Sequence, residues 1–167
     1  MIILHILFVG IFSCLVMDLW QRLVKLTYGI NPSDWGIIGR WLIMLILKQK
    51  IYNPNIEKEK SYKNELIIGW VFHYFVGVVY GVFFAFLAGP DWIAAPTFPP
   101  AFIYALATIA GGWFLLHPGL GLGWAVSKVE HPNRVRMLGL LSHNVFGLGL
   151  WLFALLLTLS ASDTVPV

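Results

Sequence analysis

The chain has 167 residues, of which 59% are hydrophobic and only 11% are charged. Soluble domains carry about 25% charged residues, so this chain has too few charges to cover a surface exposed to water, and its composition indicates a protein that lies in lipid. The formal net charge of +3 does not indicate a nucleic-acid partner, because the basic residues fall in two loops without interleaved aromatic residues. At this length we expect residues 1–167 to form a single transmembrane domain.

The first span is predicted over residues 2–19, which is close to the roughly 20 residues that a helix needs to cross a bilayer. It contains the only cysteine, Cys14, so the sequence excludes an internal disulfide and a multi-cysteine metal cluster. We expect Cys14 to behave as a small buried hydrophobic residue.

A turn sequence follows at residues 31–34 and predicts a helix start with Asn31 or Ser33 as its cap. The apolar run behind it, residues 36–47, is too short to cross a bilayer. It fits an extra short helix that lies in the interface or re-enters the membrane. Residues 48–64 are polar and are expected to form a solvated loop.

The remaining spans are predicted over residues 65–88, 101–126 and 137–159. The third of these contains His117-Pro118, where the missing backbone donor of proline predicts a kink or a break. The fold class is therefore all-α, an integral membrane four-helix bundle with the short helix between its first two spans.

All eleven lysine and arginine residues lie either between the first and second spans or between the third and fourth. Cytoplasmic loops of membrane proteins carry an excess of such residues. We therefore expect residues 20–64 and 127–136 to be cytoplasmic and both termini to lie outside.

Two spans share a pattern of glycine, histidine and glycine at four-residue intervals: Gly69, His73 and Gly77 in the second span, and Gly139, His143 and Gly147 in the fourth. Residues four apart lie on one helix face, and glycines at that spacing allow another backbone or a flat ligand to approach. Two interpretations stay open. The pattern predicts either tight helix packing, with each imidazole bonded to a neighbouring carbonyl, or a site built around the two histidines.

Each span carries one titratable group in the half of the bilayer that lies nearer to the basic loops. Ionisable groups within a membrane usually face the bundle interior or a water-filled cavity. We therefore predict a polar pocket that opens to the cytoplasm, with these candidate residues: Asp18, Arg40, His73, Tyr74, His117, His143 and Asn144. If the pocket holds a metal ion, the expected ligands are His73 and His143.

A simpler explanation exists for two of these groups. Asp18 could pair with Arg22, four residues along the same helix face. His117 could satisfy a carbonyl that Pro118 leaves without a partner.

Short motifs recur in order along the chain: Met17-Asp18-Leu19-Trp20, Gly39-Arg40-Trp41, Gly69-Trp70, His73-Tyr74, Pro96-Thr97, Pro99-Pro100-Ala101, His117-Pro118, Pro132-Asn133 and Phe146-Gly147. Together they resemble the bacterial membrane family catalogued as domain of unknown function 2938, over residues 17–152. The resemblance implies a protein of the bacterial inner membrane and supplies no activity. Together with the orientation expected from the basic loops, this predicts a multi-pass protein with both termini in the periplasm.

Three functions stay open. The first is a carrier or accessory channel for a small solute, a proton or a metal ion, and its four spans would call for a homodimer. The second is a redox subunit in which His73 and His143 ligate one haem. The third is a non-catalytic assembly protein that binds another membrane protein through its glycine faces and residues 36–47. An enzyme is less expected, because the sequence lacks the histidine spacing of zinc proteases, a nucleophile elbow and a phosphate loop. No cofactor is predicted.

Overall fold

The computed structural model describes the backbone of residues 2–162 and the side chains of residues 7–160. This part of the chain is helical and contains no strand. Four helical segments are long and apolar enough to cross a membrane: α1 (Ile2–Tyr28), α3 (Glu65–Ala94), the segment that begins with α4 (Phe98–Gly111) and reaches Gly119, and α6 (Pro132–Ser162). The predicted fold class is confirmed, and the four segments indicate a membrane protein.

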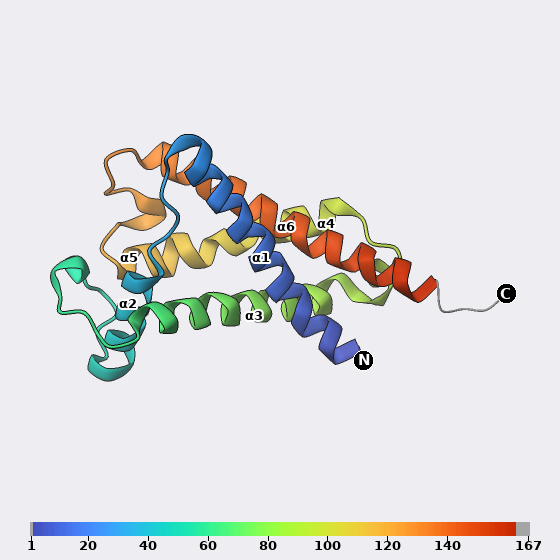
Figure 1. The fold of residues 1–167 in the computed structure, drawn as a ribbon, viewed down its shortest axis with the longest axis horizontal. Helices are drawn as coiled ribbons and strands as arrows, with labels where there is room; N and C mark the ends of the chain where they lie inside the picture. The colour runs from blue at the N-terminus through green and yellow to red at the C-terminus, as the bar shows by residue number, and fades with distance from the viewer. Residues whose placement is uncertain (1, 163–167) are drawn as a thin grey trace.

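The four segments run back and forth along the long axis of the molecule (Figure 1). The start of α1 and the end of α6 lie at one end, together with the connection between α3 and α4. The two basic connections lie at the opposite end. Helix α1 packs against both α3 and α6, and α6 also packs against α4.

The short helix α2 (Trp35–Lys48) lies beside the first turns of α3. Its cap is Asp34, whose Oδ1 accepts hydrogen bonds from the backbone N–H groups of Gly36 at 2.9 Å and Ile37 at 3.1 Å. The prediction of Asn31 or Ser33 as the cap is therefore wrong, because the helix begins later than the turn sequence indicated.

Helices α2 and α3 cross in backbone contact. A Cβ atom at Gly69 would collide with the carbonyl oxygen of Trp35, and one at Gly39 would collide with the carbonyl oxygen of Glu65. Only glycine permits so close an approach. This crossing brings the ring of Trp35 over α3, at the level of His73.

Two of the apolar segments are interrupted. Helical geometry breaks in α3 at Gly89, which has φ 75° and precedes Pro90. After α4 the chain widens into a π-helical turn, η2 (Gly112–Leu116), and then forms α5 (His117–Gly119). Because Pro118 cannot donate and would clash one turn back, the wider turn makes room for its ring.

The third segment ends earlier than residue 126, where the predicted span stops. Gly121 and Gly123 have φ of 79° and 78°, which ends the helix after Gly119. A Cβ at Gly121 would also collide with Pro54, so the loop before α3 packs against this turn. The connection to α6 holds only a 3-10 turn, η3 (Trp124–Val126).

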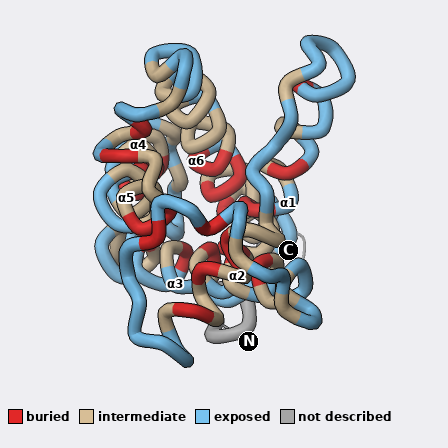
Figure 2. The backbone as a smooth tube through the Cα atoms, turned by 90° about the vertical axis from the view of Figure 1, so that its left-hand side faces the viewer, coloured by how far each residue is buried: buried red, intermediate tan, exposed pale blue. Residues whose placement is uncertain are grey.

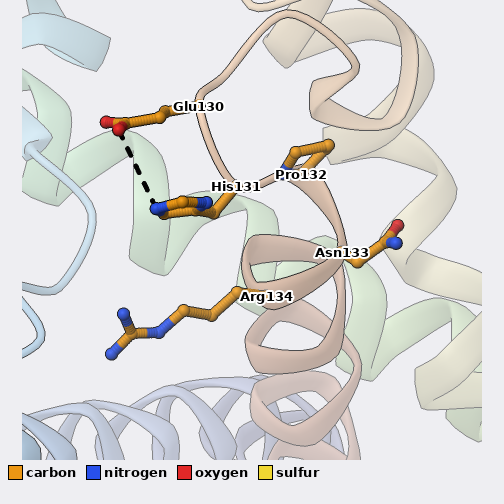
Figure 3. Close-up of a pocket in the computed structure, with 5 residues that line it drawn as sticks. All are labelled: Glu130, His131, Pro132, Asn133 and Arg134. Atoms are coloured by element: carbon orange, nitrogen blue, oxygen red, sulfur yellow. Dashed lines mark ion pairs between the residues drawn. The ribbon is translucent and has the colours of Figure 1, made fainter.

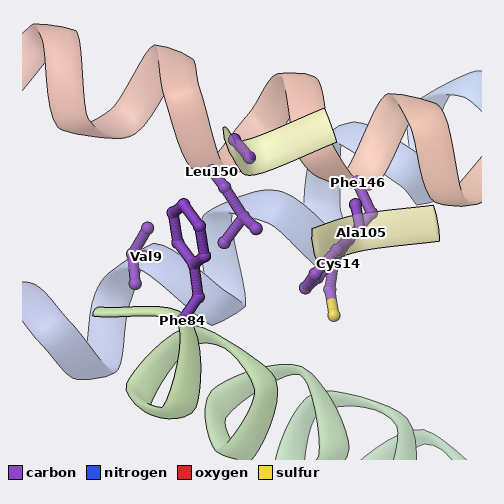
Figure 4. Close-up of a cluster of buried hydrophobic side chains, with 7 residues drawn as sticks. Val9, Cys14, Phe84, Ala105, Phe146 and Leu150 are labelled. Carbon is purple, nitrogen blue, oxygen red and sulfur yellow. The ribbon is translucent and has the colours of Figure 1, made fainter. Parts of the chain in front are cut away.

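Buried side chains form two clusters. The first lies between the long helices and is shown in Figure 4; it comprises Val9, Cys14, Phe84, Ala101, Ala105, Phe146 and Leu150. The second lies where α2, the 3-10 turn η1 (Ile56–Lys58) and the end of the third segment meet; it comprises Ile38, Trp41, Met44, Ile56 and Leu120.

The outward faces of the long helices are apolar as well. Phe75 and Phe86 of α3 are 61% and 79% exposed, and Leu19 of α1 is 66% exposed. Buried residues gather where the helices meet and at a few positions in the connecting loops, such as Asn53 and Ile56, while much of the tube is exposed (Figure 2). Lipid is the solvent that suits such a surface.

Candidate functional site

A buried cluster of hydrogen bonds joins α1 to α3. Asp18 and His73 are only 8% and 6% exposed, and Oδ1 of Asp18 lies 3.1 Å from Nε2 of His73. The hydroxyl of Tyr74 donates to Oδ2 of the same carboxylate at 2.8 Å. Each carboxylate oxygen thus has a partner, which offsets part of the cost of burying an ionisable group. Arg22 makes no ion pair with Asp18, although both are among the described residues.

Aromatic rings enclose the imidazole of His73. The ring of Trp35 lies 4.2 Å from it between centroids, at an interplanar angle of 32°. Trp70 meets the imidazole edge-on at 5.7 Å and stacks with Tyr74 at 6.1 Å. These rings restrict rotation of the imidazole, so that α1, α2 and α3 together determine the geometry at Asp18.

Two clefts open beside Asp18. The first has a volume of about 260 Å³ and is lined by Leu15, Asp18, Leu19, Arg22, Trp70 and Tyr74. The second, of about 210 Å³, shares Asp18, Arg22 and Trp70 with the first and reaches Asp34 and Trp35 at the start of α2. The carboxylate is therefore buried but reachable by a small molecule or ion.

The second histidine of the repeat lies in a separate contact, between α6 and α4. Nδ1 of His143 lies 2.9 Å from Oγ1 of Thr108 and 3.2 Å from the carbonyl oxygen of Ala105. The Thr108 hydroxyl donates to that same carbonyl oxygen at 2.6 Å. Since a carbonyl can only accept, the His143 tautomer with a proton on Nδ1 satisfies both contacts.

His117 joins neither hydrogen-bonded group. Its Nδ1 is buried and has no hydrogen-bond partner within residues 7–160. Its backbone groups are engaged: the N–H donates to the carbonyl oxygen of Gly112, and the carbonyl accepts from the N–H of Leu122 at 2.9 Å. The structure thus brings Asp18, His73 and Tyr74 together. His143 bonds instead to Thr108 and Ala105 of α4, and the side chain of His117 joins neither of these two groups.

Arg40 lies outside both clefts and organises the loop before α3. Its Nε and Nη2 donate to the two carboxylate oxygens of Glu65 at 2.9 and 2.7 Å. Its Nη1 donates to the carbonyl oxygens of Ile56 at 3.1 Å and Glu59 at 2.9 Å. The bonds to Glu65 raise the pKa of Arg40 above its ordinary value, so the guanidinium stays charged. Glu59 and Asn53 lie in the same loop, and the hydrogen bond from Asn53 lowers the pKa of the Glu59 carboxyl.

The predicted packing glycines all lie at contacts between helices. A Cβ at Gly77 would collide with the sulfur of Cys14, and one at Gly147 would lie 2.9 Å from the Cβ of Ala105. A Cβ at Gly139 would lie 3.3 Å from the side chain of Ile109. Asn144 is half-buried on α6 and makes no hydrogen bond to another side chain that the structure describes.

A wider hollow of about 460 Å³ lies in the loop before α6, between residues 130 and 134 (Figure 3). Glu130 and His131 form an ion pair there at 3.9 Å, with side chains 91% and 69% exposed. Exposed charges of this kind are screened by water, so the hollow has no chemistry comparable to that at Asp18.

No three histidine, cysteine, aspartate or glutamate side chains among the described residues are grouped so that they could hold a metal ion. The haem interpretation needs a free ligating nitrogen on each of His73 and His143. Nε2 of His73 is instead bonded to Asp18, and the two histidines contact different helices.

Residues 7–157 match the family described as "Protein of unknown function (DUF2938)". The chain belongs to this family. The match covers most of the sequence and confirms the resemblance carried by the ordered motifs. No curated protein and no solved structure matches the chain.

In this DUF2938 chain, sequence reasoning missed three residues that contact the two histidines: Trp35 and Trp70 beside His73, and Thr108 beside His143. Trp70 could have been found, because it precedes His73 by three residues and Tyr74 by four and so shares their helix face. Trp35 and Thr108 belong to other helices, and no spacing within one helix points to them.

Proposed function

We propose that the protein is a carrier or accessory channel for a small solute, a proton or a metal ion, and that Asp18, His73 and Tyr74 form its binding site. The observation that carries the proposal is a carboxylate and an imidazole, 8% and 6% exposed, bonded to each other between two apolar segments. A charged group at such depth costs about 2.5–3.5 kcal/mol or more, so its presence favours a role in binding.

The chemistry at the site suits a proton or a cation. A carboxylate bonded to an imidazole can exchange a proton between two nearby acceptors without a large movement of either side chain. The clefts beside Asp18 supply a route for water or solute to reach the pair. We further propose that this route opens to the cytoplasm of a bacterial cell, through the inner membrane, because the clefts lie towards the end with the basic loops.

Proton flux into proteoliposomes tests the proposal. The purified chain is reconstituted, a potassium diffusion potential is imposed, and the internal pH is followed with a trapped dye. Wild-type protein should acidify the interior, and Asp18→Asn should reduce the initial rate at least tenfold. Asp18→Glu, which keeps a carboxylate, should retain part of the rate. The matched control is Asp91→Asn, the same change at an exposed position beyond the break in α3. A wild-type rate equal to that of empty liposomes, with protons, metal ions and small solutes alike, contradicts the proposal.

The alternative of an assembly protein receives less support. The glycine faces that would bind a partner are occupied by contacts within the chain, at Gly69, Gly77 and Gly147. Helix α2 likewise buries Trp41 and Met44 against its own loop. A homodimer remains part of the proposal, since four spans are few for a carrier, and concentration-dependent crosslinking in liposomes tests it.

A further inference from the structure

We infer that the two clefts beside Asp18, here called the Asp18 clefts, bind a small organic ammonium ion with an aromatic or aliphatic body. The inference rests on the proposed function and names the class of solute. Four features of the site support it: an accepting carboxylate, aromatic walls, the balance of charge and an apolar rim.

The carboxylate of Asp18 has capacity left for a ligand. An ionised carboxylate offers about four lone-pair positions. Protein donors use one on each oxygen, through His73 and Tyr74. Asp18 lines both clefts, so an ammonium group entering either one can donate to it directly. A charge-assisted bond of this type is about twice as strong as a neutral one.

Aromatic rings form the walls on either side. Trp70 lines both clefts, Tyr74 lines the first and Trp35 lines the second. A cation within about 6 Å of such a ring is attracted by the negative face of the ring, and tryptophan is the best of the three aromatic residues for this contact. A carboxylate beside tryptophan rings is therefore suited to a cation and poorly suited to an anion.

The charges that line the clefts have unequal weight. Asp18 is buried, whereas Asp34, the second carboxylate in the cleft near α2, is exposed and caps that helix. The one basic residue among the lining side chains, Arg22, is exposed. Water and salt screen an exposed charge far more than a buried one, so the potential deep in the clefts is dominated by Asp18.

The rim of the first cleft indicates what the rest of the ligand is like. Leu15 and Leu19 line it and are 48% and 66% exposed, so this edge of the cleft is apolar and open. An amine with an apolar body can thus place that body against the leucines and the tryptophan. The volumes of about 260 and 210 Å³ lie below the roughly 300–1,000 Å³ of sites for drug-sized ligands, so the ligand is small.

Three probes that differ only in their end group test the inference: phenethylammonium, neutral 2-phenylethanol and anionic hydrocinnamate. Binding to the full-length protein in detergent is measured by calorimetric titration at neutral pH. We expect saturable binding of phenethylammonium, at least tenfold tighter than that of the other two probes. Asp18→Asn should abolish the preference, Trp70→Leu should weaken ammonium binding at least fivefold, and Asp91→Asn should leave it unchanged.

Equal affinities for the three probes indicate simple partition into apolar surface and overturn the inference. A preference for the ammonium that survives Asp18→Asn overturns it as well. The proposed function can fail separately. Saturable ammonium binding without flux in liposomes would show a binding protein that is not a carrier. Proton flux that depends on Asp18, without any preference for the ammonium probe, would show a proton pathway and exclude this ligand class.

Discussion

Nε2 of His73 lies 3.1 Å from Oδ1 of Asp18, although the two residues are 55 positions apart in the chain. The contact joins α1 to α3 at a position where Asp18 and His73 are only 8% and 6% exposed. Removing either residue leaves the bonded atom of the other without its partner, and the cost of an unpaired buried polar or charged atom exceeds the net gain of the pair itself. This relationship makes the two residues energetically dependent on each other.

We therefore expect strong coupling between Asp18 and His73 in a double-mutant cycle. Asp18→Asn and His73→Gln should each destabilise the folded protein by about 1.5–3 kcal/mol, and the double variant should cost less than the sum of the two. Unfolding in mixed micelles, followed by tryptophan fluorescence, measures the free energies. In the control cycle, Asp91→Asn replaces Asp18→Asn, and its coupling to His73→Gln should be near zero. Additive costs in the first cycle would show that the bond contributes nothing to stability.

The crossing of α2 over α3 gives a second prediction. Gly69→Ala should destabilise the protein by about 1–3 kcal/mol, since the new methyl group meets the backbone of Trp35 and not a flexible side chain. The control is Gly112→Ala, where the nearest atom would be 3.8 Å from the new Cβ, an ordinary contact. That variant should unfold at the wild-type temperature or slightly above it, because alanine favours helical geometry over glycine. Thermal unfolding of both variants in one detergent decides between these outcomes.

Sequence reasoning could find which residues belong to the site more readily than which residues bond to each other. The constant rise of a helix gave similar depths for Asp18 and His73. Depth, however, does not specify rotation about the helix axis or the crossing of two helices. Asp18 therefore bonds to His73 and not to Arg22, and His143 bonds to Thr108, a residue that no motif singled out.

The end of the third segment could not be predicted for a similar reason. Residues 120–126 are apolar, so hydropathy alone extends the span through them. The helix stops because Gly121 and Gly123 adopt positive φ and because Pro54 packs against the turn. The second cause involves a residue more than 60 positions away, on a loop that sequence reasoning described only as solvated.

Arg40 is the anchor of that loop, and its replacement gives a third prediction. Arg40→Lys keeps the charge but loses the paired bonds to Glu65 and most of the bonds to loop carbonyls. Trypsin should then cleave the segment of residues 48–63, which contains five lysines, at least fivefold faster than in the wild type. Glu59→Gln serves as the control. It breaks an exposed pair with Lys50 and keeps an oxygen for Asn53, so cleavage should be nearly unchanged. Equal cleavage rates for all three proteins would mean that the loop is ordered without Arg40.

The proposed orientation can be tested with the cysteine content of this chain. Its single cysteine, Cys14, is 2% exposed, so the wild-type protein should not react with a maleimide that cannot cross membranes. Thr97 and Ser61 are exposed and lie in connections at opposite ends of the molecule. In intact bacterial cells without an outer-membrane barrier, Thr97→Cys should be labelled at once, whereas Ser61→Cys should be labelled only after the membrane is permeabilised. This order follows from Lys58, Lys60 and Lys63, which flank Ser61 and favour the cytoplasmic side. The reverse order would place the Asp18 clefts towards the periplasm, and the proposed route for solute would then run from the outside.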